Sequence, residues 1–457
     1  MENLTERMAD FVFKTKFEDI SRDVIEKAKL YFLDVLGTLL AGAGIQGEAG
    51  KIICHYVQHL GGKPDARVVK AGFKTSPPLA ALANGVMANA LDYDDVDWPS
   101  KAHPSAVIFP TVLALGEALN HSGKDVLTAY ILGVEVITKI GLGVSPVHYD
   151  RGWETTSTLG VLGAAAAASK LLKLDSMGTR MALGIAASEA SGIRGNFTTM
   201  TKAFHIGKAA FDGIMAASLV AEGFTADPNI LERSLGFCPI FTEGVQVERM
   251  IDGLGDVYSF IHPGLAMKIY PSCAATHSSL DGISYLIQKY DIKPENVESV
   301  ECGIFYLHPK FLLCSYPQTG LEGKFSLEFC VALALKEKNV SIGQFTDSKV
   351  KEPEIQHLMR RVTKFVTEEL GVEETQFPGA IVKVNLKNGK SYSHKVEKRK
   401  GSPTNPLGVD EIINKFVECA QLIHSRDQAN RILDVIMNIH HQDSIKKLIE
   451  MIDDSHY

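Results

Sequence analysis

Apolar residues recur at intervals of three and four through the first half of the chain, which is the period of an amphipathic helix. Ser21 is a candidate N-cap for a helix that ends near Gly42, and a second helix is expected from about Glu48 to Leu60. From 76 to about 224 one helical pattern follows another, with Ala and Gly where helices would approach closely. The run Ala164 to Ala168 combines high helix propensity with little bulk, and it predicts a packed central helix.

The pattern changes near residue 267. Val300, Cys302 and Ile304 alternate with polar neighbours, and a second alternating segment, 382–386, precedes Asn388-Gly389. Alternation with period two predicts strands, and Asn-Gly is a strong hairpin-turn dipeptide. These segments predict a β-hairpin and a further strand in this part of the chain.

Helical segments are expected between the predicted strands, at 274–290, 326–336 and 352–367. Mixed helices and strands predict an α+β domain over residues 267–396. After Gly401-Ser402-Pro403 the helical rhythm returns and continues to the end. We therefore expect a mainly α protein. Its helical domain would comprise residues 1–266 and 397–457, and the smaller α+β domain would be an insertion.

Composition favours a soluble globular protein, because 45% of the 457 residues are hydrophobic and 22% are charged. The net charge of −7 argues against a nucleic-acid partner or an anionic membrane surface. We expect no apolar stretch as long as the roughly 18 to 20 residues needed to span a bilayer, and the start MENLTERMADF lacks a signal-peptide pattern. Seven scattered cysteines without a CxxC pair fit reduced thiols in a cytoplasm and make a structural zinc site improbable.

The stretch Asn84 to Ser105 is the strongest candidate for chemistry. It holds four acids within six residues and then a histidine before proline; these residues are Asp92, Asp94, Asp95, Asp97 and His103. Such acids repel one another, so we expect a helix end or loop where their charge is solvated, paired or used. His103 could act as a general acid or base. The alternative is an acidic, well-capped surface loop with an incidental histidine.

A second candidate stretch contains Lys202 and His205, which would share one face of a helix. Lys202 could take a proton if its pKa is lowered in a cleft, or could stay charged and hold a carboxylate. The alternative is a surface lysine beside a core histidine. Upstream, Tyr149 could donate or accept a proton, or could be an ordinary loop tyrosine. Cys273 and His277 lie at the expected domain junction, where sites often occur.

Several cofactor signatures are missing. The GxGxxG match at 42–47 follows a predicted helix instead of a strand, and no P-loop, nucleophile elbow or cysteine trio is present. DYDDVD at 92–97 could hold magnesium but lacks the glycine and spacing of a calcium loop. We therefore expect chemistry without a cofactor or a metal.

Taken together, these motifs resemble the MmgE/PrpD family of dehydratases, decarboxylases and epimerases. The resemblance covers nearly the whole chain and rests on the order and spacing of weak motifs. They are Asp34, Gly37, Ala41 and Gly42; NGVMANALDYDD followed by HPS; GW-x-T before the Ala-rich helix; Lys202 with His205-Ile206-Gly207; Lys268-x-Tyr270-Pro271; and Gly401-x-Pro403 ahead of Lys415-Phe416.

The resemblance implies a large helical domain, a smaller lid, a homodimer, and an active site in the cleft between the domains. It implies a small di- or tricarboxylate substrate and a lyase that abstracts a proton, with an epimerase as the alternative. Asp92, His103 and Lys202 match residues of the family's active site, and Tyr149 matches a tyrosine proposed as an acid/base in the epimerase branch. Further residues are implied to contact the substrate: Asp94, Glu154, His205, Lys268, Cys273 and His277.

Three positions depart from the family pattern. Glu154 stands where many relatives have a histidine, Phe311 where the decarboxylase branch uses a tyrosine, and Cys273 near a position often taken by histidine. A carboxylate at 154 would need protonation or a cationic partner beside an anionic substrate. Glu154 and Phe311 also motivate a third hypothesis, an inactive homologue kept for binding or assembly.

Overall fold

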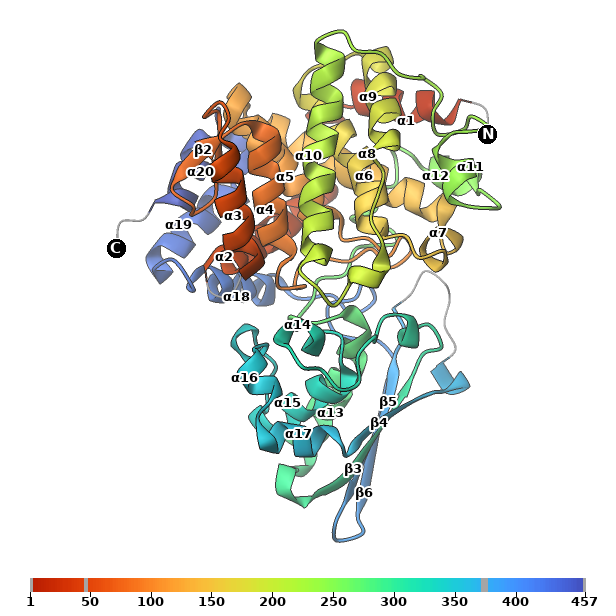
Figure 1. Ribbon diagram of the computed structural model, residues 1–457, viewed down its shortest axis with the longest axis vertical. Helices are drawn as coiled ribbons and strands as arrows, with labels where there is room; N and C mark the ends of the chain where they lie inside the picture. The colour runs from red at the N-terminus through yellow and green to blue at the C-terminus, as the bar shows by residue number, and fades with distance from the viewer. Residues whose placement is uncertain (1–2, 45–47, 371–376, 455–457) are drawn as a thin grey trace.

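The computed structural model describes residues 3–44, 48–370 and 377–454. These residues form a mainly α protein with twenty α-helices and six short strands. Figure 1 shows a larger helical body above a smaller body that contains the four-stranded sheet. The mainly α prediction is confirmed, whereas the domain boundaries at 266 and 396 stay predictions.

The larger body begins with twelve helices and a two-stranded antiparallel ribbon. The helices are α1 (Leu4–Lys14), α2 (Arg22–Gly44), α3 (Glu48–Leu60), α4 (Pro77–Asn89), α5 (Pro104–Leu119), α6 (Gly123–Val144), α7 (Val147–Asp150), α8 (Thr155–Leu171), α9 (Ser176–Ser188), α10 (Thr201–Ala221), α11 (Phe237–Phe241) and α12 (Val247–Ile251). The ribbon pairs β1 (Ala66–Val68) with β2 (Phe73–Thr75). The two helices predicted near 21–42 and 48–60 are α2 and α3; residues 45–47 of the GxGxxG match lie outside the described residues.

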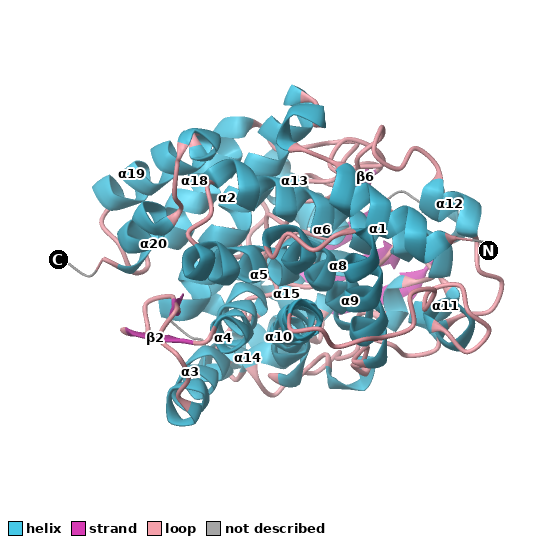
Figure 2. Ribbon diagram, turned by 90° about the horizontal axis from the view of Figure 1, so that it is seen from above, coloured by secondary structure: helices cyan, strands magenta, loops and turns pink. Residues whose placement is uncertain are grey.

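Helix α8 is the centre of this body, as the Ala-rich run predicts. It contacts α5, α6, α9 and α10, which surround it in the view from above (Figure 2). Ala164 to Ala168 are fully buried. The small side chains let four neighbours approach one helix, because close packing leaves no space for bulk.

Helices α4 and α10 cross at two glycines. A Cβ atom on Gly85 would lie 2.7 Å from the Gly207 Cα, and one on Gly207 would lie 2.2 Å from the Leu82 carbonyl oxygen. Both approaches are shorter than any normal contact, so the crossing requires residues without side chains. It brings the end of α4 next to the first turn of α10, where Lys202 lies.

The C-terminal helices pack against the N-terminal ones. They are α18 (Val409–Ala420), α19 (Arg426–Met437) and α20 (Lys446–Asp453). Helix α18 lies along α2, where a Cβ on Gly37 would stand 3.3 Å from Phe416, and Figure 1 shows the blue helices beside the red and orange ones. Buried apolar residues from both parts of the chain, between Leu4 and Met267 and between Ile412 and Ile452, share one core.

The smaller body packs helices on a four-stranded sheet with its own apolar core. The helices are α13 (Ala274–Tyr290), α14 (Gly320–Gly323), α15 (Leu327–Glu337), α16 (Asp347–Val350) and α17 (Pro353–Met359); the strands are β3 (Val297–Ile304), β4 (Val362–Val366), β5 (Ala380–Leu386) and β6 (Ser391–Val396). The sheet order is β4-β3-β5-β6, with β4 parallel to β3 and the other pairs antiparallel. The predicted strands and hairpin are confirmed, with Gly389 at a φ of 81° in the turn.

The helix predicted over 352–367 is wrong in its second half. Helix α17 ends at Met359, and Val362–Val366 forms β4. Val362, Thr363 and Phe365 are β-branched or aromatic and favour a strand. Parallel pairing with β3 decides the outcome, and a partner more than sixty residues away is not visible in local periodicity.

The expectation that no apolar stretch is long enough to span a bilayer is corrected by α6. This helix has 22 residues and a mean hydropathy of 1.6 over its most apolar window, and 94% of that window is buried inside the protein. A core helix passes the same test of length and composition as a membrane span. All seven cysteines lie in the described part of the chain and are free thiols there.

Glu135 on α6 gives the fold a pH dependence. Burial raises the pKa of this carboxyl to about 7, although it accepts the Ser259 N–H at 2.7 Å. The folded state therefore keeps a proton that the unfolded chain releases above about pH 4.5, so stability falls as pH rises from about 4.5 to 7. Glu135→Gln keeps the acceptor and removes the titration.

The Glu135→Gln variant should match the wild type at pH 4.5 and be more stable by about 2–3 kcal/mol at pH 7.5. Urea unfolding followed by circular dichroism at a series of pH values measures the difference. Glu298→Gln, at an exposed position in β3, is the matched control and should leave the pH profile unchanged. Equal slopes for the Glu135→Gln variant and the wild type would contradict the assignment.

Candidate active site

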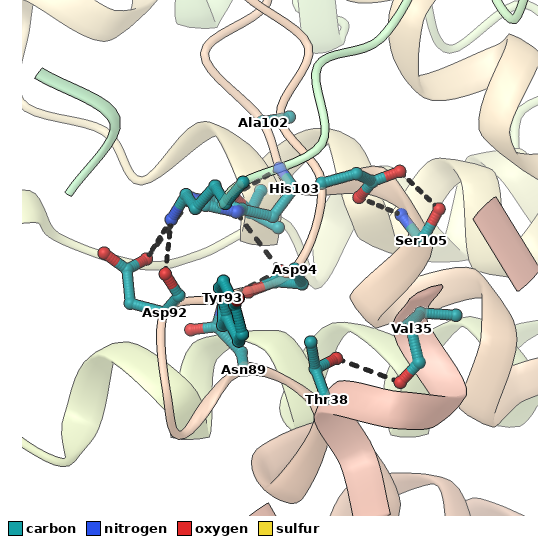
Figure 3. Close-up of polar contacts among 12 residues, drawn as sticks. Val35, Thr38, Asn89, Asp92, Tyr93, Asp94, Ala102, His103 and Ser105 are labelled. Atoms are coloured by element: carbon teal, nitrogen blue, oxygen red, sulfur yellow. Dashed lines mark hydrogen bonds and ion pairs between the residues drawn. The ribbon is translucent and has the colours of Figure 1, made fainter. Parts of the chain in front are cut away.

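The acidic loop between α4 and α5 is buried, not solvated. Asp92, Asp94, Asp95 and Asp97 are each at most 4% exposed. Asp95 accepts hydrogen bonds from the N–H and hydroxyl of Ser105, and Asp97 accepts one from the Ser100 N–H at 2.9 Å. The acidic surface-loop interpretation is therefore wrong, because these carboxylates are buried and have partners inside the protein. Figure 3 draws polar contacts around Asp92, Asp94 and Ser105.

Asp92 is the point where two lysines meet. Its Oδ1 atom lies 2.8 Å from Lys268 Nζ and 3.0 Å from Lys202 Nζ, and Lys268 also donates to the Asp92 carbonyl oxygen at 2.7 Å. Burial by itself would raise the pKa of Asp92, but the two ammonium groups outweigh it and hold that pKa far below its usual value. Asp92 is therefore an anion clamped between two cations.

Lys202 and Lys268 respond differently to this environment. Burial disfavours the charged form of both. For Lys202 the negative charges of Asp92, Asp94 and Glu154 outweigh burial and raise the pKa, whereas for Lys268 burial prevails and lowers it. Lys202 is thus fixed as a cation that can hold a carboxylate, and Lys268 releases its proton more readily. The alternative of a surface lysine at 202 is wrong, because the side chain is buried.

His103 has the geometry of an oriented acid or base. Its backbone N–H donates to Thr156 Oγ1 at 3.1 Å, and its Nδ1 lies 3.1 Å from Asp94 Oδ2. Asp94 is itself held by the Asn89 amide at 2.9 and 3.0 Å, and the His103 Nε2 lies 3.8 Å from Asp92 (Figure 3). A carboxylate behind one ring nitrogen fixes the ring and leaves the other nitrogen for proton transfer.

These groups share one cavity of about 40 Å³. Seven of the ten residues predicted from the sequence line it: Asp92, His103, Lys202, Lys268, Tyr149, Glu154 and Cys273. Distant parts of the chain carry these residues. Lys268 and Cys273 lie where the chain passes from the larger body into the smaller one, so the cavity is at the boundary between the two bodies.

Three predicted residues lie outside the cavity lining. Asp94 lies behind His103, on the side of its Nδ1 atom. His205 is buried on α10 and its pKa is lowered by burial; His277 on α13 contacts the Ser272 carbonyl oxygen at 3.3 Å, and burial lowers its pKa well below the usual value. The sequence placed His205 on the same helix face as Lys202, and His277 at the domain junction. Neither histidine is among the residues that line the cavity.

Glu154 finds the cationic environment that its position requires. It is the N-cap residue of α8, and its Oε2 accepts the Ser157 N–H at 2.6 Å. The N-terminus of a long helix carries partial positive charge, which stabilises a carboxylate there. Glu154 in turn contributes to the raised pKa of Lys202. The carboxylate is therefore accommodated by helix capping and by the nearby charge of Lys202.

Tyr149 lines the cavity with a buried hydroxyl that has no hydrogen-bond partner among the described residues. Its ring stacks on Phe311 at a centroid separation of 5.2 Å, and the Arg194 guanidinium lies 3.6 Å from the ring centroid. Burial raises the pKa of Tyr149 well above its usual value. The hydroxyl therefore stays protonated and can donate a hydrogen bond to a ligand in the cavity. Arg194 was missed by the sequence reasoning, since nothing in its local pattern marks it.

Lys324 is a second missed residue, close to the site but outside its lining. Its Nζ donates to the Leu91 carbonyl oxygen at 2.5 Å, beside Asp92. Burial, aided by the charges of Lys268 and Lys202, lowers the pKa of Lys324 to about 7. Its charge therefore changes within the physiological pH range.

Lys324→Met should remove a pH dependence of substrate binding. In the wild type, loss of the Lys324 charge above pH 7 weakens attraction for an anion, so KM should rise on the order of fivefold from pH 6 to 8. Steady-state kinetics of the wild type and variant across this range measure the effect. A KM profile that is unchanged by the substitution would contradict the role of Lys324; Lys338→Met, at an exposed helix end, is the control.

Asp92, Asp94 and His103 are also the only group of potential metal ligands found among the described residues. Two ammonium groups already contact Asp92, and they would repel a divalent cation at the same oxygen. The donor set therefore fits a carboxylate clamp better than a metal site, and the absence of a metal stays a prediction.

Comparison with known proteins gives the family. The sequence profile of the MmgE/PrpD N-terminal domain matches residues 6–250, and that of the MmgE/PrpD C-terminal domain matches residues 270–441. The chain therefore belongs to the MmgE/PrpD family, as its motifs indicate.

Similar proteins cover almost the full chain. A cis-aconitate decarboxylase of Aspergillus terreus is 27% identical, over 95% of this chain and 93% of the relative. Cis-aconitate decarboxylases of Mus musculus and Homo sapiens are each 26% identical, over 95% and 96% of this chain and 90% and 92% of the relatives.

Proposed function

We propose that this protein is a cofactor-independent lyase, of the decarboxylase or dehydratase type, that acts on a small di- or tricarboxylate. The observation that carries the proposal is the shared cavity, in which His103 backed by Asp94 faces the same space as Lys202 and Lys268. The decarboxylase activity named for the relatives is of this type.

These reactions build negative charge beside an anionic substrate, so the site must supply fixed cations and a proton carrier. In a dehydration, a base takes the proton from the carbon next to a carboxylate, and hydroxide leaves as water with a proton from an acid. In a decarboxylation, the electron pair of the breaking C–C bond stays on carbon, which then takes a proton as carbon dioxide leaves. Lys202 would stabilise the developing charge in either case.

His103 is the preferred proton carrier. The raised pKa of Lys202 makes that lysine a poor base, whereas His103 has one nitrogen oriented by Asp94 and the other toward the cavity. Lys268, with its lowered pKa, is the second choice for the base. Asp92 would hold the two lysines in place throughout the reaction.

An epimerase is the second candidate, and it is favoured by the unpartnered hydroxyl of Tyr149. Tyr149 and Lys202 line the same cavity, and groups on two sides of a carbon could remove a proton from one face and return it on the other. This proposal requires Lys202 or a neighbour to be deprotonated, which the raised pKa of Lys202 opposes.

Incubation with di- and tricarboxylates in deuterated water separates the two candidates. For a lyase we expect mass spectrometry to detect loss of water or carbon dioxide from one acid of the panel. Solvent deuterium that enters recovered acid without such a loss would defeat the lyase proposal and support the epimerase. Consumption of no acid would favour the third candidate, an inactive binding or assembly homologue, which Glu154 and Phe311 motivate.

We also propose that the chain forms a homodimer in a cytoplasm, that residues 267–396 act as a lid, and that neither nucleic acid nor membrane is a partner. The net charge of −7 supports the proposal on nucleic acid and membrane. The family membership supports the proposals of a dimer and a lid. Analytical ultracentrifugation of the full chain tests the dimer, and a sedimentation coefficient of a monomer of 49.8 kDa would contradict it.

A further inference from the structure

Much of the cavity wall is aromatic or aliphatic. Beside the lysines and carboxylates, the lining includes Val96, Trp98, Phe197, Phe311 and Phe325. Trp98 and Phe311 have ring centroids 5.9 Å apart, and Phe197 and Phe325 have centroids 6.2 Å apart. We call Trp98, Phe197, Phe311 and Phe325 the aromatic wall. Such a surface contributes to affinity by removing apolar ligand atoms from water.

The charges of the lining are largely balanced before a ligand binds. Three lysines, Lys101, Lys202 and Lys268, line the cavity together with the carboxylates of Asp92 and Glu154. His103 adds a charge only when protonated, and it lies against the buried Asp94. Just behind the lining, the ammonium of Lys324 and the carboxylate of Asp94 offset each other, so the site carries one net positive charge, or two with a protonated His103. A third negative charge on a ligand would remain uncompensated in a buried site, which is costly.

The size of the cavity limits the apolar part of the ligand. The cavity is small, with a volume of about 40 Å³. A long chain or a large ring would need the wall to move far, whereas one or two extra carbons need only small shifts of the aromatic side chains.

We propose that the substrate carries no more than two carboxylates and a compact alkyl substituent that packs on the aromatic wall. This inference rests on the proposed function, because it concerns the same cavity. The carboxylates lie at Lys202 and Lys268, and the substituent contacts Phe311 and its neighbours. The limit of two carboxylates distinguishes this substrate from cis-aconitate, the tricarboxylate in the name of the relatives.

Calorimetric titration of the full chain with four acids that cannot eliminate tests the proposal. The ligands are succinate, 2-methylsuccinate, 2-ethylsuccinate and the tricarboxylate tricarballylate. Each buried carbon should tighten binding by about fourfold, so the order of affinity is ethyl, methyl, then unsubstituted. Tricarballylate should bind at least about tenfold more weakly than 2-methylsuccinate. Tricarballylate binding as tightly as 2-methylsuccinate, or alkyl substitution without any gain, overturns the proposal.

Two phenylalanines provide a matched pair of variants. Phe311→Ala should remove most of the gain from the alkyl group, measured as the ratio of the 2-methylsuccinate and succinate affinities of the same variant, because that ratio cancels any change common to both ligands. Phe365→Ala, at a half-exposed position in β4, should retain the full gain. If Phe311→Ala does not fold, Phe311→Leu should reduce the gain partly. An undiminished gain in a folded Phe311 variant overturns the proposal.

The pattern of results separates this inference from the proposed function. If succinate binds, and Lys202→Ala weakens it by tenfold or more, the carboxylate site stands whatever the alkyl series shows. A flat alkyl series then overturns the further inference alone. If none of the four acids binds, the proposed function fails and this inference fails with it.

Discussion

Lys202→Ala is expected to lower turnover by about 100- to 1,000-fold while the fold stays intact. Lys202 is the cation of the cavity whose pKa is raised, and its Nζ lies 3.0 Å from Asp92 and 3.0 Å from the Asn89 amide oxygen. Removal of one fixed group that stabilises charge in a transition state typically has an effect of this size. The measurement is kcat/KM for whichever acid of the panel the wild type consumes.

Lys208→Ala is the matched control for this prediction. Lys208 lies on the same helix, α10, has 35% of its side chain exposed, and is paired with the buried Asp212. Its replacement should change kcat/KM by less than about twofold, because Lys208 is not among the residues that line the cavity. Circular dichroism and thermal unfolding of both variants show whether the fold is retained. Turnover by a folded Lys202→Ala variant at the wild-type rate would refute the proposed site.

Asp92→Asn is expected to destabilise the protein by about 3–5 kcal/mol and to lower turnover as well. Asparagine tolerates the left-handed backbone at this position, where φ is 51°, so the change isolates the charge. Without the carboxylate, the ammonium groups of Lys202 and Lys268 face each other unpaired in a buried site. Loss of one member of a buried ion pair has a cost of this order.

Urea unfolding at pH 7 and pH 10 measures the effect of Asp92→Asn. The deficit should shrink toward pH 10, because the unpaired lysines have lowered pKa values in the folded variant and lose their protons there. Asp291→Asn is the control: it has a similar φ of 47° and a lysine partner, Lys293 at 2.7 Å, but is exposed. Its effect should stay below about 0.5 kcal/mol. Equal effects of the two substitutions would show that the buried charge is unimportant.

Local periodicity was sufficient to predict the elements whose hydrophobic pattern is complete within their own residues. The apolar faces of α2 and α8 and the alternation around Val382–Asn388 are each set within about twenty residues. Strand β4 was not predictable in this way, because its five residues become a strand by pairing with β3 far upstream. The helical pattern before it gave no sign of where the change occurs.

The candidate site was predictable as a set of residue types and less so as a geometry. The motifs indicated Asp92, His103 and Lys202, but not that the acidic loop would be buried. Its burial depends on Lys268, which lies 176 residues from Asp92 in the sequence. The roles of Arg194 and Lys324 depend on contacts of the same long-range kind, with the Lys310 and Leu91 carbonyl oxygens. Such contacts leave no trace in spacing or composition.

The close crossing of Gly85 and Gly207 has a consequence for the design of variants of this protein. It holds the segment with Asp92 against the segment with Lys202, and any added side chain would collide with backbone on the opposite helix. A mutational library should therefore tolerate more variation at the partly buried Phe311 than at these two glycines, where almost none should survive. Changes of specificity should therefore be sought in the wall of the cavity and not at the crossing of the two helices.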